Sequence, residues 1–160
     1  MTPKKATEPA TVSRILLTVQ DASGATGVPV RRTLLRWARA ALPRSAEVTL
    51  RVVGTGEGRK LNKAWREQNH ATNVLTFEYG LVGGMLRGDV VLCAPVIARE
   101  ARQQDKRLMA HYAHMVVHGL LHLQGHDHQT DREAQRMETL ERRILARLGY
   151  ADPYVAEGWG

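Results

Sequence analysis

Histidine residues are concentrated in one short part of the sequence. The chain has seven histidines, and six lie between positions 111 and 128: His111, His114, His118, His122, His126 and His128. On a helix, the imidazoles of His118 and His122 leave the same face one turn apart and can bind one ion. Gly125 favours the left-handed conformation that ends a helix, after which the chain can turn back and bring His128 to the same point. The spacing predicts a metal site with His118, His122 and His128 as ligands.

Three imidazoles with an open fourth position are typical of a catalytic zinc ion. Structural zinc sites usually have four protein ligands and are rich in cysteine, and this chain has one cysteine, Cys93. We therefore expect one ion, Zn²⁺, with water in the fourth position. The alternative, that these histidines are ordinary polar residues of a helix, is disfavoured by Gly125 and His128. For His111 and His114 we favour a supporting place beside the metal site or along a cleft.

The spacing of His118 and His122 is also that of the H-E-x-x-H zinc peptidases. In those enzymes the glutamate after the first histidine is the general base. Here that position is Gly119, which cannot carry a proton. The sequence therefore has the metal ligands of a peptidase without its base.

The segment from His118 to His128 reads HGLLHLQGHDH and resembles the H-G-x-L-H-L-x-G-Y-D-H signature of the YbeY family. Members of that family are bacterial, single-strand-specific, metal-dependent endoribonucleases of ribosomal RNA maturation. His126 stands where the family usually has tyrosine. It could be a spare ligand or an aromatic replacement, and we favour replacement because the other three histidines match the family's ligand positions.

Further blocks extend the resemblance from about residue 47 to residue 154. The segment from Asn62 to Arg66 is similar to the family's N-x-x-[YW]-R stretch, and that from Thr72 to Phe77 is similar to its T-D-V-L-S-F stretch. The segment from Gly88 to Val91 is similar to the family's G-D-[IVL]-V-I stretch, and Asp152 to Tyr154 is similar to the usual end of the family's sequences. Asn73 replaces an aspartate of the second stretch, which removes one negative charge.

The resemblance implies hydrolysis of phosphodiester bonds in single-stranded RNA, in maturation of the 3′ end of 16S ribosomal RNA and in ribosome quality control. It also implies ribosomal RNA and the small ribosomal subunit as partners and a functional role for Arg66, which we expect to stabilise charge developing on the phosphate. Asp127 would orient the neighbouring ligand His128 or accept a proton. Alternatively, Asp127 is a turn residue that binds its own backbone.

Positive charge lies mainly in the first half of the chain. Up to Arg66 there are 13 Lys/Arg against 4 Asp/Glu, and from Glu67 there are 10 against 12. In the helix expected at residues 57–68, Arg59, Lys63 and Arg66 form a basic stripe. Such an excess suggests a polyanionic partner, and we expect RNA rather than DNA. A solvated basic surface without a partner is the alternative.

Hydrophobic periodicity predicts an α/β fold: a small mixed β-sheet of three or four strands packed with helices, with the three-histidine site at the end of a long helix. The glycine-bearing stretch 80–88 is expected to be a connection between strands. Strands are expected at 13–20, 47–53, 73–79 and 89–93, and helices at 29–42, 57–68, 96–104, 107–124 and 131–148.

We expect a single endoribonuclease domain at residues 13–154, with tails at 1–12 and 155–160. The lone cysteine and the lack of a long apolar run predict a cytoplasmic protein that does not enter a membrane. Two other functions fit the pattern. One is a metal-dependent hydrolase of another substrate, such as a peptidase, and the other is a non-catalytic ribosome assembly factor with a structural metal.

Overall fold

A computed structural model describes residues 14–66 and 72–155, except for the side chains of Trp65 and Arg66. Apart from Val155, the two predicted tails lie outside this part of the chain. The elements follow in the order β1 (Ile15–Asp21), α1 (Arg31–Ala41), β2 (Ala46–Val53), α2 (Thr55–Arg66), β3 (Val74–Val82), β4 (Met85–Cys93), α3 (Ala94–Gln103), α4 (Leu108–Leu123) and α5 (Asp131–Arg147). The predicted α/β class with a four-stranded sheet is confirmed.

The sheet is mixed, with the strand order β1-β2-β4-β3. β1, β2 and β4 are parallel, and β3 pairs with β4 in the antiparallel direction at the edge. The connection predicted at residues 80–88 was too long, because both strands continue through most of it. Only Gly83 and Gly84 form the turn, with φ of 59° and 82°, and a two-residue hairpin turn of this kind requires positive φ at both positions.

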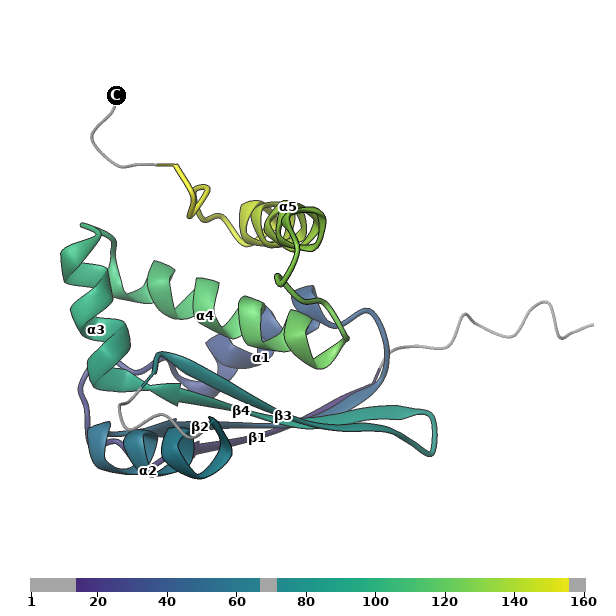
Figure 1. The fold of residues 1–160 in the computed structure, drawn as a ribbon, viewed down its shortest axis with the longest axis horizontal. Helices are drawn as coiled ribbons and strands as arrows, with labels where there is room; N and C mark the ends of the chain where they lie inside the picture. Colours follow the sequence, from purple (N-terminus) through teal and green to yellow (C-terminus); the bar gives the residue numbers. More distant parts are fainter. Residues whose placement is uncertain (1–13, 67–71, 156–160) are drawn as a thin grey trace, which may run out of the picture.

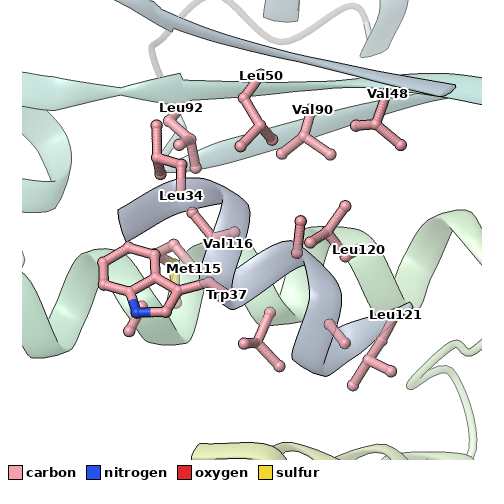
Figure 2. Packing of buried hydrophobic residues seen from close by; sticks show 14 of the residues in the cluster. Leu34, Trp37, Val48, Leu50, Val90, Leu92, Met115, Val116, Leu120 and Leu121 are labelled. Atoms are coloured by element: carbon pink, nitrogen blue, oxygen red, sulfur yellow. The ribbon is translucent and has the colours of Figure 1, made fainter. Parts of the chain in front are cut away.

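Side chains of the central strands alternate between two apolar clusters. The larger cluster lies on the face covered by α1 and α4, and it includes Leu34 and Trp37 of α1 together with Leu50 and Leu92 of the sheet (Figure 2). A smaller cluster around Val91 lies on the opposite face, where Figure 1 shows α2. Both faces of the sheet are therefore covered, as expected for strands with long apolar runs.

α4 is buried on nearly all sides. It contacts α1, α3 and α5 as well as β3 and β4, and Figure 1 shows it between the sheet and α5. A helix that is apolar around most of its circumference belongs in a core, and the buried imidazoles of His111 and His114 are exceptions to its apolar character. In the described ranges, no helix is long and apolar enough to cross a membrane.

At Gly119, α4 lies very close to the sheet. A Cβ atom at this position would lie 2.8 Å from Cγ1 of Val90 and 3.2 Å from Cγ2 of Val74. Val90 is fully buried, so it has little room to move. The position where a zinc peptidase carries its glutamate is therefore filled here by the sheet, and a larger side chain would push α4 away.

We predict that Gly119→Ala lowers the free energy of unfolding by up to about 2 kcal/mol, because overpacking of a core costs roughly 1–3 kcal/mol and alanine returns about 1 kcal/mol of helix propensity. Urea unfolding would measure the change. Gly56→Ala is the matched control: this position in α2 has open space around it, so alanine is expected to stabilise by up to about 1 kcal/mol. A change of the same sign in both variants would contradict the close-approach argument.

Candidate metal centre

Two imidazoles come from the C-terminal half of α4. The ring centroids of His118 and His122 are 5.2 Å apart. The helix is rich in leucine, alanine and methionine and has no proline, so its regular 3.6-residue turn continues through both positions. The two rings therefore lie on one side of α4, as the sequence predicted.

The third imidazole, that of His128, is positioned by the turn that ends α4. Gly125 has a φ of 95°, and its N–H donates to the carbonyl of His122 at 3.0 Å, while the N–H of His126 donates to the carbonyl of Leu121 at 3.2 Å. These two bonds form a Schellman motif, which ends a helix and reverses the chain direction. The reversal returns His128 to the side of α4 that carries the other two rings.

The three rings converge on one point. The His128 centroid lies 5.6 Å from that of His118 and 5.2 Å from that of His122, and one potential ligand atom from each lies within 4.8 Å of the others. The side chains of His118 and His128 are 22% and 54% exposed, so solvent reaches the group. Three nitrogen donors with an accessible side fit a catalytic Zn²⁺.

Asp127 and His126 lie within the same turn but do not join these ligands. Oδ1 of Asp127 accepts a hydrogen bond from the backbone N–H of His128 at 2.7 Å and lies 3.8 Å from the ring Nδ1 of that residue. This contact matches the turn-residue alternative, and a proton-accepting role for Asp127 stays a prediction. His126 belongs to neither group of potential ligands in the described part of the chain. It lines a cavity of about 300 Å³ beside Leu81 and Leu123.

A buried carboxylate from α5 supports the centre. Glu141 has no exposed surface, and one of its oxygens, Oε2, accepts a hydrogen bond from Nδ1 of His118. The other oxygen lies 3.2 Å from Nε2 of His114 and accepts from the hydroxyl of Tyr154. A carboxylate on Nδ1 fixes the orientation and tautomer of an imidazole, which leaves Nε2 of His118 free for an ion.

Glu141, His114 and His118 form a second group whose potential ligand atoms lie within 4.8 Å of one another. Both imidazoles are already at hydrogen-bond distance from the carboxylate. A bound zinc ion would have to lie between Nδ1 of His118 and Oε2 of Glu141 at about 2 Å from each, and these two atoms are too close together for that. These contacts fit hydrogen bonds rather than coordination, so His118 connects the exposed group of three imidazoles to a buried polar group.

The Glu141 carboxylate stays ionised although it is buried. Burial raises the pKa of this carboxyl, but hydrogen bonds from His114, His118 and Tyr154 together with the charge of His118 outweigh that effect and lower the pKa to about 2. The carboxylate is therefore ionised at neutral pH. A fixed negative charge behind His118 favours a cation in front of it.

His111 lies one helical turn before His114 and has its own acidic partner. Its Nε2 is 2.8 Å from Glu100 of α3, and the side-chain amide of Asn73 donates to the two oxygens of Glu100 at 3.1 and 3.2 Å. Burial lowers the pKa of His111, and the hydrogen bond to Glu100 opposes that effect. Asn73, whose role the sequence did not indicate, therefore joins β3 to α3 and α4.

Two residues of the predicted basic stripe, Arg59 and Lys63, lie away from the histidines (Figure 1). Arg59 and Lys63 are exposed on α2, which packs on the face of the sheet opposite α4 (Figure 1). Arg66 is the last residue of α2, and its side chain lies outside the described residues. Leu61 of the same helix packs against the smaller apolar cluster. The roles of the three basic residues stay predictions.

Glu141 was missed in the sequence, although a signal for it exists. The buried face of α5 includes Met137, Ile144 and Leu145, and Glu141 lies four residues after the first and three before the second. A carboxylate in the middle of an apolar helical face is rarely buried without a partner. With six histidines nearby in the sequence, that position indicates an acidic residue that supports an imidazole.

Known proteins resemble the chain over most of its length. The sequence model of the family described as Endoribonuclease YbeY matches residues 29–149. A protein of Aromatoleum aromaticum named Endoribonuclease YbeY is 55% identical over 146 residues, which cover 89% of this chain and 94% of that protein. Its namesake from Nitrosomonas eutropha is 53% identical over 141 residues, covering 88% and 99%. A Thermotoga maritima protein with a known solution structure shares the fold, with a TM-score of 0.53 and 19% identity over 86% of this chain and 99% of its own.

We predict that Glu141 makes the stability of the metal-free protein depend on pH in acid. Because its pKa is about 2 in the folded chain against an ordinary value of 4.5, its contribution is complete above about pH 5 and is lost as the pH falls toward 2. The lowered pKa corresponds to about 3 kcal/mol. The advantage of the natural protein over Glu141→Gln in urea unfolding should shrink steadily as the pH falls through this range.

Glu138→Gln is the control for this experiment. Glu138 lies on the same helix, but its side chain is 38% exposed beside Arg142, and exposed ion pairs contribute less than about 1 kcal/mol. Parallel pH profiles for the natural protein and Glu141→Gln would show that the buried carboxylate does not carry this charge.

Proposed function

Because the chain belongs to the YbeY family of endoribonucleases, we propose that it hydrolyses phosphodiester bonds in single-stranded RNA with one metal ion held by His118, His122 and His128. The observation that carries this proposal is the convergence of three imidazoles, with potential ligand atoms within 4.8 Å of one another, at a solvent-accessible helix end. A bound ion would supply a Lewis acid that activates water or polarises a phosphoryl oxygen.

Zn²⁺ is the ion that the donor set fits best. Imidazole nitrogen suits zinc and other late transition metals, whereas Mg²⁺ and Ca²⁺ prefer oxygen ligands. Cys93, the only cysteine of the chain, is buried at the end of β4 in the smaller apolar cluster, so thiolate does not enter the proposed ligand set. The three-nitrogen set leaves a position for solvent or substrate, as catalytic zinc sites do.

The residues around the centre have separate tasks in this proposal. Glu141 holds His118 from behind, so the imidazole keeps one orientation. Asp127 fixes the backbone of the turn that carries His128 and is the carboxylate nearest in sequence that could accept a proton. Gly119 lets α4 lie close to the sheet, and its lack of a carboxylate argues against the peptidase alternative.

The proposed substrate is ribosomal RNA of the small subunit, in maturation of the 3′ end of 16S RNA and in ribosome quality control in the cytoplasm. The net charge of +7 supports a polyanionic partner. Arg66 would stabilise charge on the phosphate through its planar set of donors, and Arg59 and Lys63 would bind the backbone. Since α2 and α4 lie on opposite faces of the sheet (Figure 1), an RNA strand that contacts both has to pass around an edge or an end of the sheet.

We predict that removal of the ion with a chelator abolishes cleavage of single-stranded RNA and that Zn²⁺ restores it. His128→Ala should lower the metal content from about one ion per chain to nearly none, because two imidazoles bind zinc far more weakly than three. Metal analysis and an RNA cleavage assay measure the two effects. His126→Ala is the matched control, since this neighbouring imidazole belongs to neither group of potential ligands and its loss should leave the metal content unchanged.

Other results would identify the alternatives. Cleavage of a protein such as casein, with RNA left intact, would support a hydrolase of another substrate. A folded, metal-free His128→Ala protein that still cleaves RNA would contradict the catalytic role of the ion. Retained function in ribosome assembly by the same variant, without cleavage activity in the natural protein, would indicate a non-catalytic factor.

We predict that Arg66→Ala reduces RNA cleavage by roughly 10²-fold or more, as the loss of one charge-stabilising donor does in other active sites, while the metal content stays unchanged. Arg66→Lys should recover only part of the activity, because lysine keeps the charge but loses the two-pronged geometry. Loss of the metal in Arg66→Ala would show that this residue supports the centre instead of the substrate.

A further inference from the structure

The end of the described chain folds back against the metal centre. α5 ends with the same pair of backbone hydrogen bonds as α4: the N–H of Gly149 donates to Ala146 at 3.0 Å and that of Tyr150 to Leu145 at 2.9 Å. The chain then reverses and runs along α5. We call the three residues Asp152–Tyr154 the C-terminal clasp.

The clasp is fixed from two sides. From the α3–α4 connection, Nζ of Lys106 donates to the carbonyl of Pro153 at 2.8 Å. From α5, the guanidinium of Arg142 forms an ion pair with Asp152 at 3.0 Å and lies 5.3 Å from the ring centroid of Tyr154. Asp152 also accepts from the backbone N–H of Tyr154 at 2.9 Å. These contacts place the Tyr154 ring in one position between α4 and α5.

The hydroxyl of Tyr154 reaches the buried carboxylate. It donates to Oε1 of Glu141 and lies 3.1 Å from Nε2 of His114. Burial and the hydrogen bond to Glu141 raise the pKa of this hydroxyl, so it keeps its proton. Without Tyr154, Oε1 of Glu141 would depend on His114 alone, at 3.2 Å, and a buried charge with fewer donors is costly.

Tyr154 also lines the space next to the carboxylate, and 39% of its own surface is exposed. A cavity of about 180 Å³ lies beside the centre, and Tyr154 lines it together with His118, His128 and Glu141. If the ring were absent, this cavity would widen beside Glu141. Water would then compete for the oxygens that now accept from the two imidazoles and the hydroxyl.

We propose that Tyr154 is a positioning residue of the metal centre, which acts through Glu141 on the ligand His118. The inference rests on the proposed metal site. The C-terminal clasp fixes the position of the Tyr154 hydroxyl, and this hydroxyl donates a hydrogen bond to the Glu141 carboxylate. The carboxylate in turn accepts from Nδ1 of His118, which keeps the imidazole in the tautomer that leaves Nε2 for the ion. Loss of such outer hydrogen bonds typically weakens metal binding 10- to 100-fold without removing a ligand.

The test compares the zinc dissociation constants of Tyr154→Phe and Tyr150→Phe, measured by competition with a chromophoric chelator. Tyr150 packs edge-on against Trp37 at a centroid distance of 6.1 Å, away from the three imidazoles. We expect the constant to rise roughly tenfold or more in Tyr154→Phe and to stay unchanged in Tyr150→Phe. Thermal unfolding of the metal-free proteins would show that both variants remain folded.

A double-mutant cycle separates positioning from a general structural effect. If Tyr154 acts through the carboxylate, Tyr154→Phe should add little to the loss of zinc affinity already caused by Glu141→Gln. Equal zinc affinities for Tyr154→Phe and the natural protein, or full additivity with Glu141→Gln, would overturn this inference alone. A natural protein that binds no zinc would overturn the proposed metal centre itself, and the inference with it.

Discussion

The arrangement depends on a negative charge that is held away from water. The Glu141 carboxylate has no exposed surface, and burial of an unpaired charge costs several kcal/mol. Three donors offset that cost: two imidazoles of α4 and the hydroxyl of Tyr154. The carboxylate therefore joins α5, α4 and the end of the described chain. If one of these parts moved, Glu141 would lose a donor, so their mutual position is strongly constrained.

Pairing with carboxylates also explains why α4 can carry histidines although it lies in the core. The helix is apolar toward the sheet, where Gly119 allows close contact with Val90, and its histidines face the acidic partners on α3 and α5. Glu100 lies at hydrogen-bond distance from His111, and Glu141 lies at hydrogen-bond distance from His114 and His118. Each buried imidazole therefore has a carboxylate partner from another helix. The only histidines of α4 with appreciable exposure are those that converge with His128.

Local patterns in the sequence predicted the elements and the convergence of the rings. Periodicity of apolar residues is a local property, and so are the four-residue spacing of His118 and His122 and the helix end at Gly125. The two strands of the β-hairpin were predicted too short, because the glycines at 80 and 88 suggested a loop between them. Only Gly83 and Gly84 turn the chain. One glycine within a strand does not end it when the flanking residues pair.

The residues that support the metal centre could not be predicted in this way, because their contacts depend on which faces of the helices and the sheet pack together. Local patterns do not encode this packing. Glu141 is 23 residues from His118 and Tyr154 is 40 residues from His114, so their contacts exist only after α5 and the end of the described chain have packed on α4. The face of the sheet on which α2 packs is likewise a property of the whole fold, and it separates Arg59 and Lys63 from the imidazoles (Figure 1).

The division between local ligands and distant support has a physical consequence. The three imidazoles come from one helix and its turn, so even an isolated α4 segment carries all of them. In such a segment, however, the rings are free to rotate, and binding an ion would require ordering them at a cost in conformational entropy. The folded chain has already ordered His118 through Glu141 and the turn through Asp127. Metal binding and tertiary packing therefore stabilise each other, because anything that binds the folded state alone shifts the folding equilibrium toward it.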